Sequence, residues 1–344
     1  MFVQPYRRLT DYLGIASAEQ YLHGWPGSGI VAMDEAVLGR LGSDVRGVWD
    51  RVLVRDHGQS DGQVSVDAWG VGHRETGLEG FGPVLHPLAD VTDPDVIEQY
   101  AWPDMTHPDL YTAAGVRARY LAAEGQYAVV GAPWLVAPLE RASQLQGREQ
   151  VLVNMLRYPE WASALLRKVT GVCMAQLKGF LAAVGDILDL IMIGDDLGTQ
   201  SGLLLSPRLY RAMLKPLHAD LVAVVKAQSA ARVVFHTDGD VFALLDDLVE
   251  IGIDVLSPVE STAGDMADLP RLKRRYGHNL VFCGALDTQH ILPLGNPDDV
   301  RREVRRVSQA LGPGFMLAPT YTIMDAVPPQ NVLAMSDAIM ESGR

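Results

Sequence analysis

Short apolar runs alternate with amphipathic helical stretches from about residue 125 to the end of the chain. This alternation is typical of a parallel sheet built from βα units. Each run ends in a polar loop or in a loop marked by glycine or proline. The pattern predicts six strands: Tyr127–Gly131, Leu188–Gly194, Arg232–His236, Asp254–Ser257, Leu280–Gly284 and Phe315–Ala318.

The stretches between these runs carry ordinary helix start and stop signals. Ser206-Pro207 and Asn296-Pro297 each provide an N-cap side chain followed by proline at the first helical position. Gly252 follows an apolar stripe at helical spacing and is placed as a C-terminal stop. We therefore expect helices between the predicted strands.

An eight-stranded barrel needs two strands besides these six, and they would lie in the less regular first 120 residues. The candidates are Asp44–Val48 and part of Gly29–Met33. An open doubly wound sheet also holds six parallel strands, but no Gly-x-Gly-x-x-Gly turn follows the first strands. We predict the α/β class and a (β/α)8 TIM barrel with an irregular N-terminal segment. No repeat or linker divides the chain, so we expect one domain over residues 1–344, irregular in 1–120 and regular in 121–344.

Composition and charge narrow the class of protein. Of 344 residues, 48% are hydrophobic and 21% are charged, which allows a large core. The formal net charge of −13 argues against nucleic acid or an anionic membrane surface as a partner, because both need a basic face. Met1–Tyr12 lacks the apolar core of a signal peptide, and apolar runs such as Leu188–Ile193 are far shorter than the ~20 residues of a membrane span. We expect a cytoplasmic protein.

Carboxylates collect just past the predicted strand ends, where barrel enzymes place their chemistry. Along Leu188–Asp196, the β-branched Ile191 and Ile193 suit the face that meets the helices, so Asp196 should point inward. Asp196 is therefore the better catalytic candidate than Asp195.

A second group of candidates follows the next strands. His236 and Asp238 are two residues apart and share one side of their strand, so they form either a catalytic acid–base pair or a pair that stabilises a loop. Tyr321 follows the last predicted strand and is a candidate proton donor.

Other residues near strand ends are candidates for substrate binding. Cys283 shares a strand face with Asp287 but also fits a small buried hydrophobe. Trp134 suits a pocket wall and the core equally, and Trp69 suits a pocket wall somewhat less. The substrate-binding candidates are Trp69, Trp134, Glu140, Gln200, Glu260, Cys283, Asp287 and Gln289. Seven histidines show no ligand spacing and are expected on the surface or in loops: His57, His73, His86, His107, His218, His278 and His290.

Five motifs, in order over about residues 125–335, carry a resemblance to the uroporphyrinogen decarboxylase-like superfamily. Each is weak alone, but their order is specific. The resemblance implies a (β/α)8 barrel, in agreement with the unit count. The motifs are Gly131-Ala132-Pro133-Trp134 followed by Glu140, Asp196 with Leu203-Leu204-Leu205-Ser206-Pro207, Phe235-His236-Thr237-Asp238-Gly239, Cys283-Gly284-Ala285-Leu286-Asp287, and Pro328-Pro329-Gln330-Asn331.

The resemblance also implies what two branches of the superfamily would need. In the decarboxylase proper, an N-terminal arginine-rich loop binds the carboxylates of a porphyrinogen, but the corresponding residues 23–29 hold no arginine. Uroporphyrinogen decarboxylation is therefore not expected.

In cobamide-dependent methyltransferases, a His-x-Cys pair and a later cysteine hold zinc. Here His236 is kept, Asp238 stands in the cysteine position, and Tyr321 or a neighbour stands in the last one. No cofactor is required by this pattern, but His236 and Asp238 remain candidate ligands for a divalent metal such as zinc in an oxygen-rich site.

The leading hypothesis is methyl transfer or demethylation of a small, partly apolar molecule, with a methyl-corrinoid as co-substrate and a corrinoid protein as partner. Asp196 and Gln200 would orient the polar end of the substrate, and Trp134 and Trp69 would supply apolar walls. One alternative is a cofactor-independent decarboxylase or lyase that acts on a small carboxylic acid and uses Asp196. A second alternative is a non-catalytic binding module. Homodimer formation is left open.

Overall fold

The computed structural model describes residues 1–24, 29–52, 64–75 and 81–342. Most of the N-terminal stretch without arginine (25–28) and His57 lie outside the described residues.

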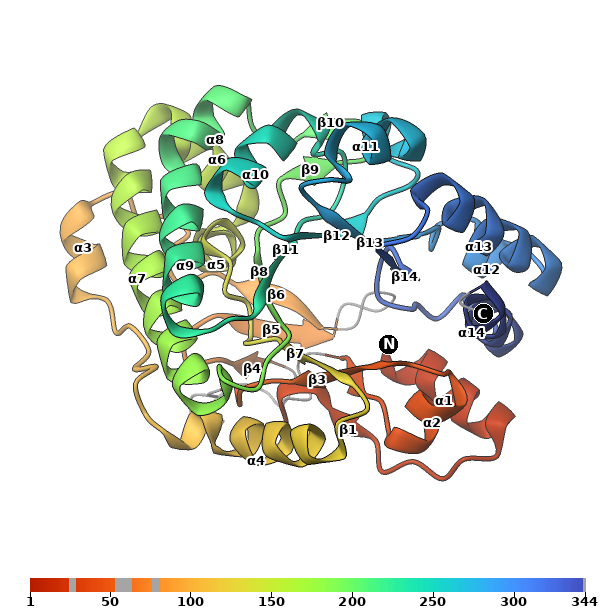
Figure 1. Cartoon of the computed structure of the whole chain (residues 1–344). Coiled ribbons are helices and arrows are strands. Elements are labelled where there is room, and N and C mark those ends of the chain that lie inside the picture. Colours follow the sequence, from red (N-terminus) through yellow and green to blue (C-terminus); the bar gives the residue numbers. More distant parts are fainter. Residues whose placement is uncertain (25–28, 53–63, 76–80, 343–344) are drawn as a thin grey trace.

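Within the described part, seven parallel strands form one curled sheet with helices around it, as Figure 1 shows. All six strands predicted from the C-terminal two thirds are present, and Asp44–Val48 is confirmed as a sheet strand. The fold is therefore of the barrel type predicted. In spatial order, the strands are β14 (Phe315–Pro319), β13 (Val281–Leu286), β12 (Val255–Val259), β11 (Arg232–His236), β8 (Leu190–Gly194), β7 (Ala128–Gly131) and β3 (Val45–Val48).

The prediction of a barrel strand within Gly29–Met33 is wrong. In this segment β2 (Val31–Ala32) pairs antiparallel with β1 (Gln20–Tyr21), and Val31 N donates to Met1 O at 3.0 Å. The segment thus pairs with the N-terminus and with β1 instead of with the edge of the sheet. Helix α2 (Glu35–Arg40) begins directly after Asp34, so the extended stretch is also too short to run along the sheet.

The N-terminal segment covers the side between the edge strands β3 and β14. Helix α2 (Glu35–Arg40) reaches both sides of this gap: Glu35 pairs with Arg46 of β3 at 2.6 Å, and Arg40 pairs with Asp337 of α14 (Pro329–Ser342) at 3.3 Å. Helix α1 (Val3–Leu13) packs on α14, and Figure 1 shows both on the right, beside the gap between β14 and β3.

Helices follow the strands. They are α3 (Pro94–Gln99), α4 (Asp109–Glu124), α5 (Pro138–Gln146), α6 (Arg148–Arg157), α7 (Pro159–Val184), α8 (Pro207–Met213), α9 (Lys215–Gln228), α10 (Leu245–Ile251), α11 (Leu269–Tyr276), α12 (Ile291–Leu294) and α13 (Pro297–Leu311). The predicted signals set these limits: Ser206 accepts from Leu209 N, Asn296 forms a capping box with Asp299, and Gly252 ends α10 at φ 92°. Helices α4, α9 and α13 contact the outer face of the sheet, and others, such as α3 and α12, pack on neighbouring helices.

The remaining elements are short. A small antiparallel sheet lies upstream of α3, and a two-stranded ribbon follows β8. These elements are β4 (Ser65–Val66), β5 (Gly72–Glu75), β6 (Phe81–Leu85), β9 (Gly198–Thr199), β10 (Gly202–Leu203), and the 3-10 helices η1 (Leu22–Gly24), η3 (Phe242–Leu244) and η4 (Gly264–Ala267).

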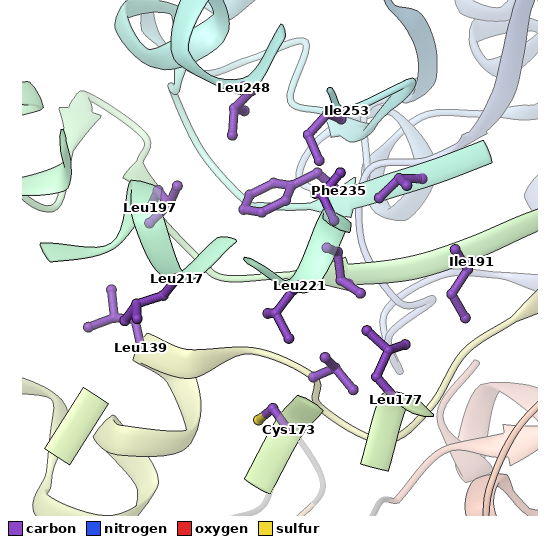
Figure 2. Close-up of a cluster of buried hydrophobic side chains, with 14 of the residues drawn as sticks. Leu139, Cys173, Leu177, Ile191, Leu197, Leu217, Leu221, Phe235, Leu248 and Ile253 are labelled. Carbon is purple, nitrogen blue, oxygen red and sulfur yellow. The ribbon is translucent and has the colours of Figure 1, made fainter. Parts of the chain in front are cut away.

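The main core lies between the outer face of the sheet and the helices. Figure 2 shows Ile191 of β8 and Phe235 of β11 meeting Leu177 of α7 and Leu221 of α9. All four side chains are buried. Since full burial of such a side chain contributes about 1.5–3 kcal/mol, this layer fixes the two strands whose ends carry Asp196 and His236. No helix in the described residues is long and apolar enough to cross a membrane.

Candidate functional site

The carboxyl ends of β8 and β11 come unusually close, and glycine makes this approach possible. A Cβ on Gly194 would lie 2.0 Å from His236 O, and one on Gly198 would lie 2.7 Å from Asp238 O. Gly239 has φ 81° and also faces the backbone of the loop after β8. The two loops are therefore held against each other by their backbones, which fixes the side chains that they carry.

Asp196, His236 and Asp238 form one cluster at these loops. His236 Nε2 lies 3.9 Å from Asp196 Oδ1 and 4.0 Å from Asp238 Oδ1, and Asp238 N donates to Asp196 Oδ1 at 3.3 Å. The three side chains each offer one ligand atom within 4.8 Å of the others. Asp238 Oδ1 is buried and accepts no hydrogen bond from the described residues. The cluster thus has an acceptor available for a cation or a donor ligand.

Asp195 turns away from this cluster, as strand alternation predicts. It is 1% exposed, and its carboxylate accepts from Leu139 N (2.9 Å) and Glu140 N (2.7 Å) at the start of α5. His218 Nε2 donates to the same carboxylate at 2.8 Å, and Tyr210 OH lies 3.3 Å from His218 Nδ1. Asp195 therefore ties β8 to the outer helices, while Asp196 faces the interior.

Glu140 lies beside the cluster because Asp195 holds the first turn of α5. Its side chain pairs with Arg148, which also lies 3.9 Å from Asp196 Oδ2. Burial raises the pKa of Glu140 to about 7, although Arg148 opposes the rise. Burial likewise raises the pKa of Asp238 to about 6, with His236 opposing the rise and Asp196 adding to it. Both carboxyl groups can therefore take up or release a proton near neutral pH.

A cavity of about 510 Å³ opens beside Asp238 at the carboxyl end of the sheet. This volume suits a small molecule. The lining comes from the loops after β8, β11, β12, β13 and β14, and its residues are Gly198, Thr199, Gln200, Asp238, Gly239, Glu260, Thr288, Gln289, Pro293, Leu294, Tyr321, Met324, Asp325, Ala326 and Val327. We call this space the mouth cavity.

Five of the residues proposed from the sequence line the mouth cavity: Gln200, Asp238, Glu260, Gln289 and Tyr321. Tyr321 is 43% exposed, so its ring lies at the rim. Glu260 is the opposite case, because it follows β12 and is only 4% exposed. Burial raises the pKa of Glu260 to about 7; Asp238 adds to this rise, and the Thr320 hydroxyl opposes it.

Other sequence candidates lie apart from the mouth cavity. Trp69 and Trp134 border a separate space of about 10 Å³ together with Asp50 and Gln176, so they belong to the packed region around the N-terminal part of the chain. Asp287 uses its carboxylate to accept from three backbone N–H groups of the turn before α12, those of Gln289, His290 and Ile291. Cys283 is half-buried, burial raises its thiol pKa, and it does not line the mouth cavity.

The expectation that seven histidines lie on the surface or in loops is wrong for two of them. His218 is fully buried in α9, and His73 is buried in β5, where its Nε2 lies 3.2 Å from Asp67 Oδ2. Each is held by a buried carboxylate: Asp67 lies six residues before His73, and Asp195 lies 23 residues before His218. Neither spacing is a recognised ligand or pairing pattern, so the sequence did not indicate these pairs.

Arg148 and Asp325 are near the site but were not among the residues proposed from the sequence. Arg148 begins α6 directly after Gly147, and only the turn between α5 and α6 brings it back to Glu140 and Asp196. Asp325 lines the mouth cavity and pairs with Arg8 of α1 at 2.6 Å. No local sequence signal marks either residue.

Comparison with known proteins places this geometry in a family. Residues 63–342 match the family model described as uroporphyrinogen decarboxylase (URO-D). No curated protein sequence matches the chain. Among solved structures, a methyltransferase from Methanosarcina mazei is similar in fold over 100% of both chains, with a TM-score of 0.66 and 19% sequence identity.

Proposed function

The chain belongs to the uroporphyrinogen decarboxylase family, and from this premise we propose that it is an enzyme that transfers a methyl group to or from a small molecule. We further propose a methyl-corrinoid as co-substrate, carried by a corrinoid protein. The observation that carries the proposal is the position of the Asp196–His236–Asp238 cluster directly beside the mouth cavity.

The lining of the mouth cavity suits methyl transfer. A methyl group passes between two nucleophiles and needs an approach from which water is excluded. Pro293, Leu294, Met324, Ala326 and Val327 provide apolar walls on the side formed by the loops after β13 and β14. The loops after β8, β11 and β12 contribute polar side chains, among them Gln200, Asp238 and Glu260, so a bound molecule would turn its polar end toward these loops.

The same cluster fits a divalent cation. Its ligand set of one imidazole and two carboxylates suits zinc or a harder metal, and Asp238 Oδ1 is an acceptor without a hydrogen-bond partner in the described residues. When bound, such a cation would act as a Lewis acid that lowers the pKa of a group on the substrate. His236, Asp196 and Asp238 would hold it. The proposal of a metal rests on these three side chains alone.

The chain's own residues also supply proton transfer. Asp238 and Glu260 line the mouth cavity, and the raised pKa of each leaves the carboxyl group part-protonated near neutral pH. Either group can therefore give a proton to a leaving atom or accept one from an incoming nucleophile. The phenol of Tyr321 at the rim is a further donor.

The test is to incubate the purified protein with methylcobalamin and candidate acceptors and to follow loss of the cobalt–methyl absorbance. His236→Ala and Asp196→Ala should each lower the rate by about 100-fold or more. His107→Ala is the matched control, because His107 is exposed in the loop before α4. Equal rates in all four proteins would remove the proposed roles.

Metal binding has its own measurement. Wild-type protein dialysed against zinc should retain one ion per chain, and Asp238→Asn and His236→Ala should retain much less. Retention that does not differ between these proteins would exclude the cluster as the metal site.

Two other outcomes remain informative. Turnover of a small carboxylic acid without methylcobalamin would identify a lyase, and ligand binding without any turnover would identify a binding module. A cytoplasmic location is part of the proposal, as is the absence of a nucleic-acid partner.

A further inference from the structure

The strongest unexplained feature of the mouth cavity is a buried acid. Glu260 follows β12, lines the cavity and is 4% exposed, yet its Oε2 accepts no hydrogen bond from the described residues. A buried polar atom without a partner costs free energy that a well-placed ligand donor can recover. Glu260 therefore marks a position at which a bound molecule supplies a hydrogen-bond donor.

The charge of the cavity lining indicates which kind of hydrogen-bond donor a ligand should carry. Asp238, Glu260 and Asp325 line it, and no lysine, arginine or histidine is found among the lining residues that the structure describes. Arg8 neutralises Asp325 at the rim through a 2.6 Å contact. His236 Nε2 lies 4.0 Å from Asp238 Oδ1 and 3.9 Å from Asp196 Oδ1, and Arg148 lies 3.9 Å from Asp196 Oδ2, but neither residue lines the cavity. Among the described residues, Asp238 therefore has cationic groups near it only from outside the lining, and Glu260 forms no ion pair.

We propose that the mouth cavity binds a small N-methylated amine in its protonated form, with the ammonium N–H donating to Glu260 Oε2. A cation between Glu260 and Asp238 relieves their mutual repulsion, and the N–H fills the vacant acceptor. The N-methyl groups then contact the apolar wall formed by Leu294, Met324 and Val327. A carboxylate ligand meets repulsion from the same two acids.

This inference rests on the proposed function in one respect: the bound amine would be the small molecule that gives or receives the methyl group. Binding itself requires no corrinoid, no metal and no turnover. The two ideas can therefore fail separately.

The experiment is calorimetric titration of the wild-type protein with four probes of similar size. N,N-dimethylethanolamine, protonated at neutral pH, carries both charge and an N–H. Choline keeps the charge but has no N–H, 3-methylbutan-1-ol has neither, and 3-methylbutanoate is an anion. Since a charge-assisted hydrogen bond is worth about tenfold or more in affinity, the protonated tertiary amine should bind at least about tenfold more tightly than its uncharged isostere. Choline should fall between them, and the anion should bind least.

Glu260→Gln keeps the shape of the side chain and removes its charge, so it should abolish the preference for the amine over the alcohol. Glu98→Gln is the control, because Glu98 lies on α3 and pairs at the surface with Lys168. Equal affinity of wild-type protein for the amine and the alcohol would overturn the inference, and that result does not depend on how any variant folds. Selective amine binding without methylcobalamin turnover would instead contradict the proposed function and leave the inference standing.

Discussion

Replacing Glu260 by glutamine should remove a loss of stability that the wild-type protein undergoes as the pH rises. Burial raises the carboxyl pKa from 4.5 to about 7, and the side chain is almost completely removed from water. The folded protein therefore holds a proton that the unfolded chain has already released between about pH 4.5 and pH 7. Over this window, stability contributed by the protonated group is lost as the pH rises. At about 1.4 kcal/mol per tenfold change, the full effect is about 3 kcal/mol.

The assay is urea unfolding of wild-type protein and Glu260→Gln at about pH 5 and about pH 8. Glutamine does not titrate, so the variant should gain about 2–3 kcal/mol relative to wild type on going from the lower to the higher pH. The comparison is between the two proteins' changes in the free energy of unfolding from the lower to the higher pH. Contributions of titrating groups that both proteins share cancel in it, and so does any pH-independent cost of burying the amide. Glu98→Gln, whose side chain is 76% exposed, should show no such gain. A pH-independent difference between Glu260→Gln and wild type would refute the reasoning, because Glu260 would then ionise as freely in the fold as in the unfolded chain.

Three further changes test the framework around the site. Asp195→Asn should cost about 3 kcal/mol or more by thermal or urea unfolding, because it breaks a buried charge-assisted contact with His218 and weakens two bonds to the backbone of α5. Gly194→Ala should destabilise the protein by more than about 2 kcal/mol, since its Cβ would lie 2.0 Å from His236 O; soluble, fully stable protein would argue against the close strand approach. Gly171→Ala in α7 should instead stabilise it by about 0.5–1 kcal/mol, as a new Cβ there meets nothing within 4 Å among the described residues.

The regular part of the fold was predictable because each strand buries its own apolar run. Ile191 and Ile193 pack against helices, so their spacing alone shows which side of β8 faces outward. The same alternation distinguishes Asp195 from Asp196. Positions that depend on a single strand and its adjacent helix were therefore accessible from the sequence.

Positions that depend on distant segments were not accessible. The apolar stretch Gly29–Met33 resembles a strand, but its backbone partners come from the first residues of the chain and from β1. Trp69 and Trp134, which were candidates for substrate binding, border a small space with Asp50 and do not line the mouth cavity. The roles of the other site candidates stay predictions, although the fold brings Gln200, Glu260 and Tyr321 to one cavity.

The two adjacent acids directly after β8, Asp195 and Asp196, link the stability of the barrel to the electrostatics of its mouth. The Asp195 carboxylate accepts hydrogen bonds from His218 and from the first turn of α5. The side chain of Glu140 projects from that same turn. Glu140 in turn holds Arg148, the cation that lies 3.9 Å from Asp196. A change in the outer layer therefore moves the positive charge that opposes Asp196, even though no outer residue touches the cavity. The two consecutive carboxylates at this strand end therefore differ in role: Asp195 fixes the outer helices, and Asp196 belongs to the cluster with His236 and Asp238.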